Sequence, residues 1–150
     1  MAPKKQHKMK KTVVYTYGVF DLFHKGHVEL LKEAKALGDE LIVGLFTDEV
    51  AESFKRKPVI SLKDRMHLIQ HCVFVDKIVV QKELEPDKII KKLKPHILAK
   101  GPGAGWEENE EIPGEKTMKK IGGKVHKLGY HHGISTSQII KKIQDQKENT

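Results

Sequence analysis

Strand-like and helix-like segments alternate along nearly the whole chain, and this alternation limits the possible fold more than any other feature. The strand-like segments are residues 12–17, 40–46, 76–80, 96–99 and 124–128, and the helix-like segments are residues 28–37, 61–72, 86–93, 115–121 and 137–146. Within one domain, this alternation is typical of a parallel sheet with helices on both faces. Because crossovers between parallel strands are right-handed, we expect an α/β fold with a Rossmann-like, doubly wound sheet of about five strands.

Residues 28–46 show the pattern clearly. Leu30, Ala34 and Leu37 recur at helical spacing, and Gly38 follows as the residue just past a helix end. The next run, ELIVGLF, is apolar throughout, as expected for a strand buried on both faces. Ligands of such sheets bind beyond the carboxyl ends of the strands, so we expect the functional site at that edge.

The charge of the chain is concentrated at its N-terminus. The chain has 150 residues and a formal net charge of +8, and without the five lysines of the first eleven residues the remaining 23 basic and 20 acidic residues leave +3. We expect residues 1–11 to form a basic, mobile tail, residues 12–146 to form one domain and residues 147–150 to form a polar tail. A main role in nucleic-acid binding is disfavoured because the nine aromatic residues are not interleaved with a basic face.

Cysteine content and hydropathy restrict the cellular setting. Cys72 is the only cysteine, which excludes an internal disulfide framework and an all-cysteine metal site. No apolar run approaches the ~18 residues of a membrane-spanning helix, and the charged N-terminus has no apolar signal core behind it. We therefore expect a cytoplasmic protein without a membrane span.

The first strand runs into a segment that suits phosphate groups. Residues 18–27 read GVFDLFHKGH, in which Gly18 and Gly26 allow the backbone to approach a ligand closely. If the turn between His24 and His27 is helical, the two imidazoles share a face at a helix N-terminus. Free amide groups and the helix dipole favour a phosphate there. Alternatively, the two histidines are exposed or capping residues.

A second helix start has the same character. Gly133 and Ile134 precede Ser135 and Thr136 at the beginning of the last helix, and three consecutive hydroxyls lie beside free helix amides. Ser135 with Gln138 also matches a capping box, which is the alternative interpretation. Two such anion sites at one edge of the sheet would suit a triphosphate.

The combination of these segments resembles a known family. GVFDLFHKGH followed by VELLKEAKALGDELIVG, together with the late GISTS, is similar to the cytidylyltransferase-like branch of the HxGH nucleotidyltransferases, over about residues 12–143. The relatives that it suggests are glycerol-3-phosphate and choline-phosphate cytidylyltransferases and the adenylyltransferase domain of ADP-heptose synthesis. Leu22 argues against the coenzyme A and NAD branches, which usually carry proline there.

The resemblance implies the reaction and its participants. A phosphate of a small phosphorylated alcohol attacks the α-phosphorus of a nucleoside triphosphate in line, and pyrophosphate leaves. Mg²⁺ is expected to bind mainly through the triphosphate, without a metal site built by the protein. A homodimer is also implied, with residues 72–78 near the interface.

The resemblance also implies residue roles. His24, His27, Lys57 and Arg65 match catalytic positions, with the histidines on the phosphates and Lys57 bridging the two substrates. Alternatively, Lys57 is a solvated member of the basic run 55–57, and Arg65 forms a surface ion pair. The residues implied in nucleotide binding are Tyr17, Gly18, Val19, Phe20, Gly26, Lys100, Gly101, Gly133, Ile134, Ser135 and Thr136.

Five further residues are candidates for substrate contact or orientation. Asp21 orients an imidazole or the metal shell, or caps its turn, and Asp48 orients the site or caps a helix. Trp106 stacks on a base or cages an amine, or anchors its loop by packing. Tyr130 stands where cytidylyltransferases carry an arginine, and His131 replaces that arginine or lies exposed in a turn.

Different segments of the sequence favour different nucleotides. Residues 70–72 (QHC) and the N-terminal half resemble the cytidylyltransferases and favour CTP, although Val73 and Tyr130 replace arginines that bind CTP there. Residues 94–101 and 122–125 resemble the ADP-heptose group, so an ATP-using sugar-phosphate adenylyltransferase is the alternative. A non-catalytic nucleotide-binding protein is the alternative from another class. Glycerol 3-phosphate, choline phosphate, ethanolamine phosphate and sugar phosphates all remain open as acceptors.

Overall fold

A five-stranded parallel sheet forms the centre of the protein. The computed structural model describes residues 10–101, 111–129 and 134–148. The strand order is β3-β2-β1-β4-β5, and every pairing is parallel. The strands are β1 (Val13–Gly18), β2 (Glu40–Phe46), β3 (Lys77–Gln81), β4 (Ile97–Lys100) and β5 (Lys124–Lys127). The predicted doubly wound sheet is therefore confirmed.

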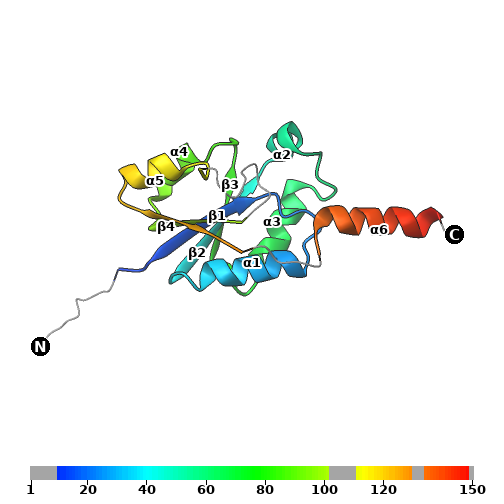
Figure 1. Ribbon diagram of the computed structural model, residues 1–150, viewed down its shortest axis with the longest axis horizontal. Coiled ribbons are helices and arrows are strands. Elements are labelled where there is room, and N and C mark those ends of the chain that lie inside the picture. Colours follow the sequence, from blue (N-terminus) through cyan, green and yellow to red (C-terminus); the bar gives the residue numbers. More distant parts are fainter. Residues whose placement is uncertain (1–9, 102–110, 130–133, 149–150) are drawn as a thin grey trace, which may run out of the picture.

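Helices cover both faces of this sheet (Figure 1). They are α1 (Lys25–Lys35), α2 (Asp48–Phe54), α3 (Leu62–Gln70), α4 (Asp87–Leu93) and α5 (Glu115–Lys120), whereas α6 (Thr136–Glu148) projects away from the sheet (Figure 1). On one face, Leu31 of α1 and Ile69 of α3 pack in the cluster around Val43. On the other face, Ile90 of α4 and Met118 of α5 join a separate cluster. No helix within the described ranges is long and apolar enough to cross a membrane.

The helix boundaries differ from the prediction in places where capping decides them. Helix α1 begins at Lys25, three residues earlier than predicted, because His24 caps it. Helix α2 was not predicted, and it begins where the Thr47 hydroxyl accepts a hydrogen bond from the Val50 amide at 3.1 Å. Helix α6 continues to Glu148, two residues past the predicted end of the domain.

The topology creates one position suited to a ligand. Strand β1 lies between β2 and β4, so the chain winds outward in opposite directions from β1. In open α/β sheets, ligands bind at this switch point, beyond the carboxyl ends of the strands. The carboxyl ends that meet there are those of β1, β2 and β4, at Gly18, Phe46 and Lys100.

Candidate active site

A cleft opens at this switch point. Its empty volume is about 760 Å³, a figure that includes space open to solvent. Residues predicted for the site that line it are Tyr17, Gly18, Val19, Phe20, Asp21, His27, Lys100, Gly101 and Thr136. Residues that were not predicted but also line it are Thr16, Leu30, Phe46, Phe54, Lys55, Arg56 and Pro58. The structure thus gathers segments that are distant in the sequence into one cavity.

The two histidines at the start of α1 are held by backbone hydrogen bonds. The Gly26 amide donates to His24 Nδ1 at 3.0 Å, and the His24 amide donates to His27 Nδ1 at 3.2 Å. The two rings stack with their centroids 3.7 Å apart. Because each Nδ1 accepts from an amide, the hydrogen of each neutral ring is assigned to Nε2. Each imidazole therefore carries one N–H that is oriented by its own helix turn.

Burial keeps these imidazoles neutral. It lowers the pKa of His27 to about 3, with further contributions from the nearby His24 and Lys55. Burial also lowers the pKa of His24. At neutral pH, both rings consequently act as hydrogen-bond donors and not as cations.

Gly26 makes this arrangement sterically possible. A Cβ atom at this position would lie 2.9 Å from Cε1 of His24 and 3.3 Å from Cγ2 of Ile134. A larger residue would displace the His24 ring from the first turn of α1. The same glycine allows the segment before α6 to approach the start of α1.

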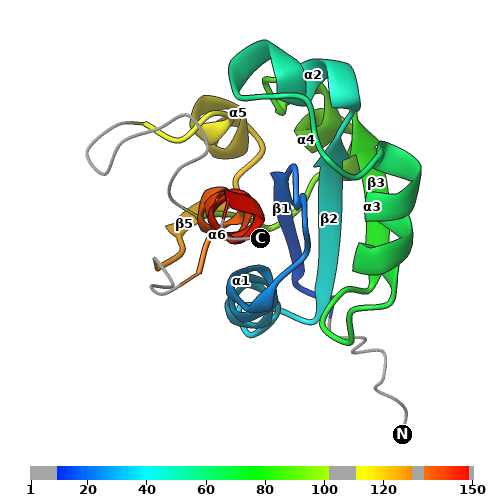
Figure 2. The ribbon, with the colours of Figure 1, turned by 90° about the vertical axis from the view of Figure 1, so that its right-hand side faces the viewer.

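The two predicted phosphate sites converge. The Thr136 hydroxyl donates to the Asp21 carbonyl at 2.9 Å, and its oxygen lies 3.3 Å from Nε2 of His24. Figure 1 shows that α6 begins beside the start of α1, and Figure 2 shows α6 next to α1 when viewed along the axis of α6. Ser135 Oγ accepts from the Gln138 amide at 3.1 Å and so caps α6, as its alternative interpretation predicted. We call His24, His27 and Thr136 the phosphate cradle, after the role that the sequence predicts for these two segments.

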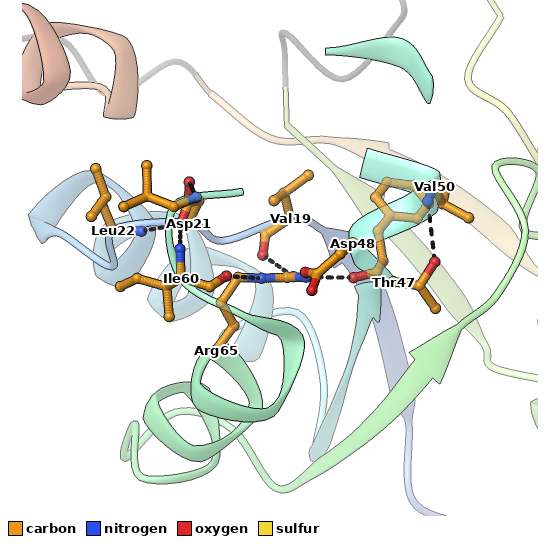
Figure 3. Close-up of polar contacts among 10 residues, drawn as sticks. Val19, Asp21, Leu22, Thr47, Asp48, Val50, Ile60 and Arg65 are labelled. Atoms are coloured by element: carbon orange, nitrogen blue, oxygen red, sulfur yellow. Dashed lines mark hydrogen bonds and ion pairs between the residues drawn. The ribbon is translucent and has the colours of Figure 1, made fainter. Parts of the chain in front are cut away.

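The Asp21 carboxylate anchors a loop and does not contact an imidazole (Figure 3). Its side chain is buried and accepts hydrogen bonds from the amides of Leu22, Val59 and Ile60 at 3.1, 2.8 and 2.9 Å. These hydrogen bonds link the β1–α1 loop to the α2–α3 loop, and the predicted role of Asp21 in orienting a histidine or a metal shell stays a prediction. Phe20 and Leu22, on either side of it, adopt left-handed backbone conformations with φ of 53° and 50°, a type of strain that clusters at functional sites.

Arg65 lies behind the cleft wall and is fully buried. Its guanidinium donates to the carbonyls of Ile60, Val19 and Phe46 at 2.9, 2.8 and 3.0 Å (Figure 3). It also forms an ion pair with Asp48, the first residue of α2, at 2.6 Å. It is neither in a surface ion pair nor among the residues that line the cleft. Its contacts join the ends of β1 and β2 to the start of α3.

The basic loop after α2 brings different cations to the cleft than the sequence predicted. Lys57 is exposed and does not line the cavity, whereas Lys55 and Arg56 do. Burial and the neighbouring Arg56 lower the pKa of Lys55. The run of three cations was a visible signal in the sequence, but only the anchoring of this loop by Asp21 decides which of them face inward.

Lys100 brings a buried cation to the end of β4. Only 4% of its surface is exposed. Its Nζ donates to the Tyr17 carbonyl and lies 4.1 Å from the centroid of the Tyr17 ring. Burial, assisted by the charge of Lys55, lowers the pKa of Lys100 to about 7.

Four predicted site residues lie outside the described part of the chain. These are Trp106, Tyr130, His131 and Gly133. The remaining predicted residues occupy the carboxyl edge of the sheet, the turns beyond it or the layer directly behind it.

A doubly wound sheet with a cleft and a helix N-terminus at its switch point is the arrangement found in nucleotide-binding α/β proteins. Residues 15–142 match the family model described as cytidylyltransferase-like, and the chain belongs to this family of nucleotidyltransferases. The predicted family is thus confirmed.

Named relatives and solved structures agree with this assignment. The chain is 43% identical over 140 residues to the bifunctional protein HldE of Helicobacter pylori strain HPAG1, and 40% identical over 138 residues to that of Actinobacillus succinogenes. These matches cover 92% and 91% of the chain but 28% of each relative, so the chain spans just over a quarter of their length. A lipopolysaccharide core biosynthesis protein of Thermoplasma volcanium superposes with a TM-score of 0.70 at 30% identity, covering 83% of this chain and all of that one.

Proposed function

We propose that this chain transfers the AMP moiety of ATP to the phosphate of a heptose phosphate or similar sugar phosphate, with release of pyrophosphate. The observation that carries this proposal is that His27 and Thr136 both line the cleft at the switch point, and that His24 stacks on His27 and lies 3.3 Å from the Thr136 hydroxyl. Similarity to the HldE proteins favours ATP and a sugar phosphate as the substrates. The N-terminal half of the sequence had instead favoured CTP as the nucleotide.

The proposed reaction needs positioning and charge stabilisation, and no protein nucleophile. An oxygen of the acceptor phosphate forms a bond to the α-phosphorus of ATP. The bond from that phosphorus to the oxygen bridging to the β-phosphate breaks, and its electron pair leaves with pyrophosphate. The Nε2–H groups of His24 and His27 donate to phosphate oxygens as negative charge develops on them. Lys55 and Arg56 add positive charge from the opposite loop.

We assign Asp21, Asp48 and Arg65 positioning roles. Asp21 holds the α2–α3 loop through three amides, and Arg65 with Asp48 holds the strand ends. In this proposal, these side chains set the positions of the cleft cations and of the β1–α1 loop.

Mg²⁺ is proposed to enter with the nucleotide. No cluster of three or more histidine, cysteine or acidic side chains suited to a metal occurs within the ranges that the structure describes. The Asp21 carboxylate is occupied by amides and that of Asp48 by Arg65. The ion would therefore be held mainly by triphosphate oxygens and water, where it neutralises phosphate charge.

The test is a pyrophosphate-release assay of the purified chain with Mg²⁺. ATP and CTP are each combined with heptose phosphate, other sugar phosphates, glycerol 3-phosphate, choline phosphate and ethanolamine phosphate. We expect release with ATP and a sugar phosphate, and a loss of about 10²–10³-fold in kcat for His24→Ala or His27→Ala. His126→Ala, which removes an exposed histidine of β5, serves as the matched control.

Three outcomes would contradict the proposal. Full activity of both cradle variants would refute the mechanism. Preference for CTP would refute the choice of nucleotide. ATP binding without release of pyrophosphate from ATP in the presence of any of the acceptors would support the non-catalytic alternative.

We also propose a homodimer whose interface includes residues 72–78. Val73, in this segment, is 87% exposed, as an apolar residue at an interface between subunits would be in one isolated copy. Sedimentation should show a dimer that Val73→Glu dissociates, and a monomeric wild-type protein would exclude the interface.

A further inference from the structure

The floor of the cleft contains two buried polar atoms without a partner in the described part of the chain. They are Thr16 Oγ1 and Arg56 Nε, and both residues line the cavity. Thr16 is 1% exposed and lies on β1, at the level of the switch point. Buried polar groups are almost always hydrogen-bonded, and leaving one unpaired is costly. Orphaned groups at the bottom of a ligand cleft therefore indicate atoms that a ligand satisfies.

Lys100 adds an incompletely compensated charge at the same place. Its ammonium group has the Tyr17 carbonyl and ring as partners, and no ion pair with a carboxylate is found for it among the described residues. A buried ammonium is normally paired with a carboxylate. Three other charged residues line the cavity: Lys55 and Arg56 are cations, and the carboxylate of Asp21 is engaged by backbone amides. The floor is thus organised to receive negative charge.

We propose that Lys100 and Thr16, assisted by Arg56, form the subsite that holds the phosphate of the acceptor substrate. This assignment rests on the proposed function, in which two phosphate-bearing substrates must meet in one cleft. The phosphate cradle at the start of α1 serves the triphosphate, so the acceptor needs a second anion site beside it. Two cationic donors and a hydroxyl match the oxygens of a phosphate monoester dianion.

The groups that face Lys100 make its protonation dependent on the ligand. From β1, Tyr17 stays neutral because burial, with Glu85 and Asp87 nearby, raises its pKa above the ordinary value. From the α2–α3 loop, Lys55 and Arg56 are positively charged, and from α1, His27 is neutral. The Asp21 carboxylate is engaged by backbone amides. An entering dianion is consequently the group that stabilises the charged form of Lys100, and acceptor binding takes up a proton near pH 7.

An NMR titration tests this subsite without requiring turnover. The protein is labelled with ¹³C-lysine, the Lys100 Cε signal is assigned by through-bond spectra, and inorganic phosphate is the probe. We expect the signal to titrate near pH 7 in the free protein, and saturating phosphate to raise the pKa by about 1 to 3. Thr16→Val, which keeps the side-chain shape, should weaken phosphate binding about tenfold. An unchanged Lys100 pKa in saturating phosphate would overturn the proposal.

A kinetic arm assigns the phosphate to the acceptor. Lys100→Met should raise KM for the sugar phosphate about tenfold or more and leave KM for ATP nearly unchanged. Lys124→Met, which removes an exposed lysine from the adjacent strand, is the matched control and should change neither. A rise confined to the KM for ATP would overturn the assignment.

The two arms separate failure of the subsite from failure of the proposed function. A Lys100 that responds to phosphate in a protein without pyrophosphate release would leave the subsite standing and refute the reaction. Turnover in a protein whose Lys100 pKa does not change with phosphate would support the reaction and refute the subsite. Because the titration uses the wild-type protein, it remains decisive even if Lys100→Met does not fold.

Discussion

Arg65 and Lys100 are both buried cations near the carboxyl edge of one sheet, yet their surroundings differ in kind. Arg65 donates to three carbonyls and to the Asp48 carboxylate. Lys100 contacts one carbonyl and the face of an aromatic ring, and its pKa falls to about 7. The protein has compensated the first charge internally and has left the second to be compensated from the cleft. Burial alone therefore does not separate a structural cation from a functional one, whereas the completeness of its hydrogen bonding does.

Removing Arg65 should have the largest effect on stability. Arg65→Met leaves three carbonyls and the Asp48 carboxylate without their donor, so we expect the free energy of unfolding to fall by about 3 kcal/mol or more. Urea denaturation measures this change. Arg65→Lys should be intermediate, because one ammonium cannot reproduce a planar fork of donors.

Lys63→Met is the matched control for this prediction. It removes an exposed cation from the same helix, and it should change the free energy of unfolding by less than about 0.5 kcal/mol. If Arg65→Met were no more destabilising than Lys63→Met, Arg65 would not be the brace that its contacts indicate.

Lys100→Met should change stability in the opposite direction. The unfolded lysine has a pKa of about 10.4, whereas the folded one has a pKa of about 7. The folded state consequently binds fewer protons between these values, and the stability that Lys100 costs the fold grows as the pH falls from about 10 to 7. Replacement by methionine removes this cost, and Tm should rise by about 2–4 °C for each kcal/mol gained.

The pH profile checks the cause of this stabilisation. Thermal unfolding of the wild type and Lys100→Met should differ most at pH 6–7 and converge toward pH 10. A constant difference across this range would assign the effect to packing, and a destabilised variant would make Lys100 a structural residue like Arg65.

The comparison also shows where inference from the sequence ended. The strands and the existence of α1 followed from local patterns, since hydrophobic periodicity is a property of contiguous residues, although α1 begins three residues earlier than predicted. The role of Arg65 did not, because a charged residue on a helix is normally exposed. Its burial depends on carbonyls at Val19 and Phe46 that the helix sequence does not contain.

The α2–α3 loop shows the same limit. Three cations are consecutive at positions 55–57, and the sequence favoured Lys57 by resemblance. The orientation of the loop is set by hydrogen bonds from the amides of Val59 and Ile60 to Asp21, which is 38 and 39 residues away. Long-range contacts of this kind leave no local pattern, so the residues that face the cleft, Lys55 and Arg56, were missed.

His27 is a half-buried base in the same cleft, and its replacement has the smallest expected effect. It accepts one hydrogen bond from the His24 amide and remains neutral, with a pKa lowered from 6.5 to about 3. The stability that depends on its neutral form is fully present above pH 6.5 and is lost as the pH falls toward 3, because in this range the unfolded state binds a proton that the folded state does not bind.

The variant His27→Asn tests this pH dependence. It keeps a hydrogen-bond acceptor but cannot protonate, so its free energy of unfolding should fall less steeply between pH 6.5 and 4 than that of the wild type. Urea midpoints at pH 7, 5.5 and 4 measure the slope, with His126→Asn at an exposed position as the control. Parallel slopes for His27→Asn and the wild type would show that the ring protonates freely in the folded protein, and the cradle would then bind phosphate as a cation.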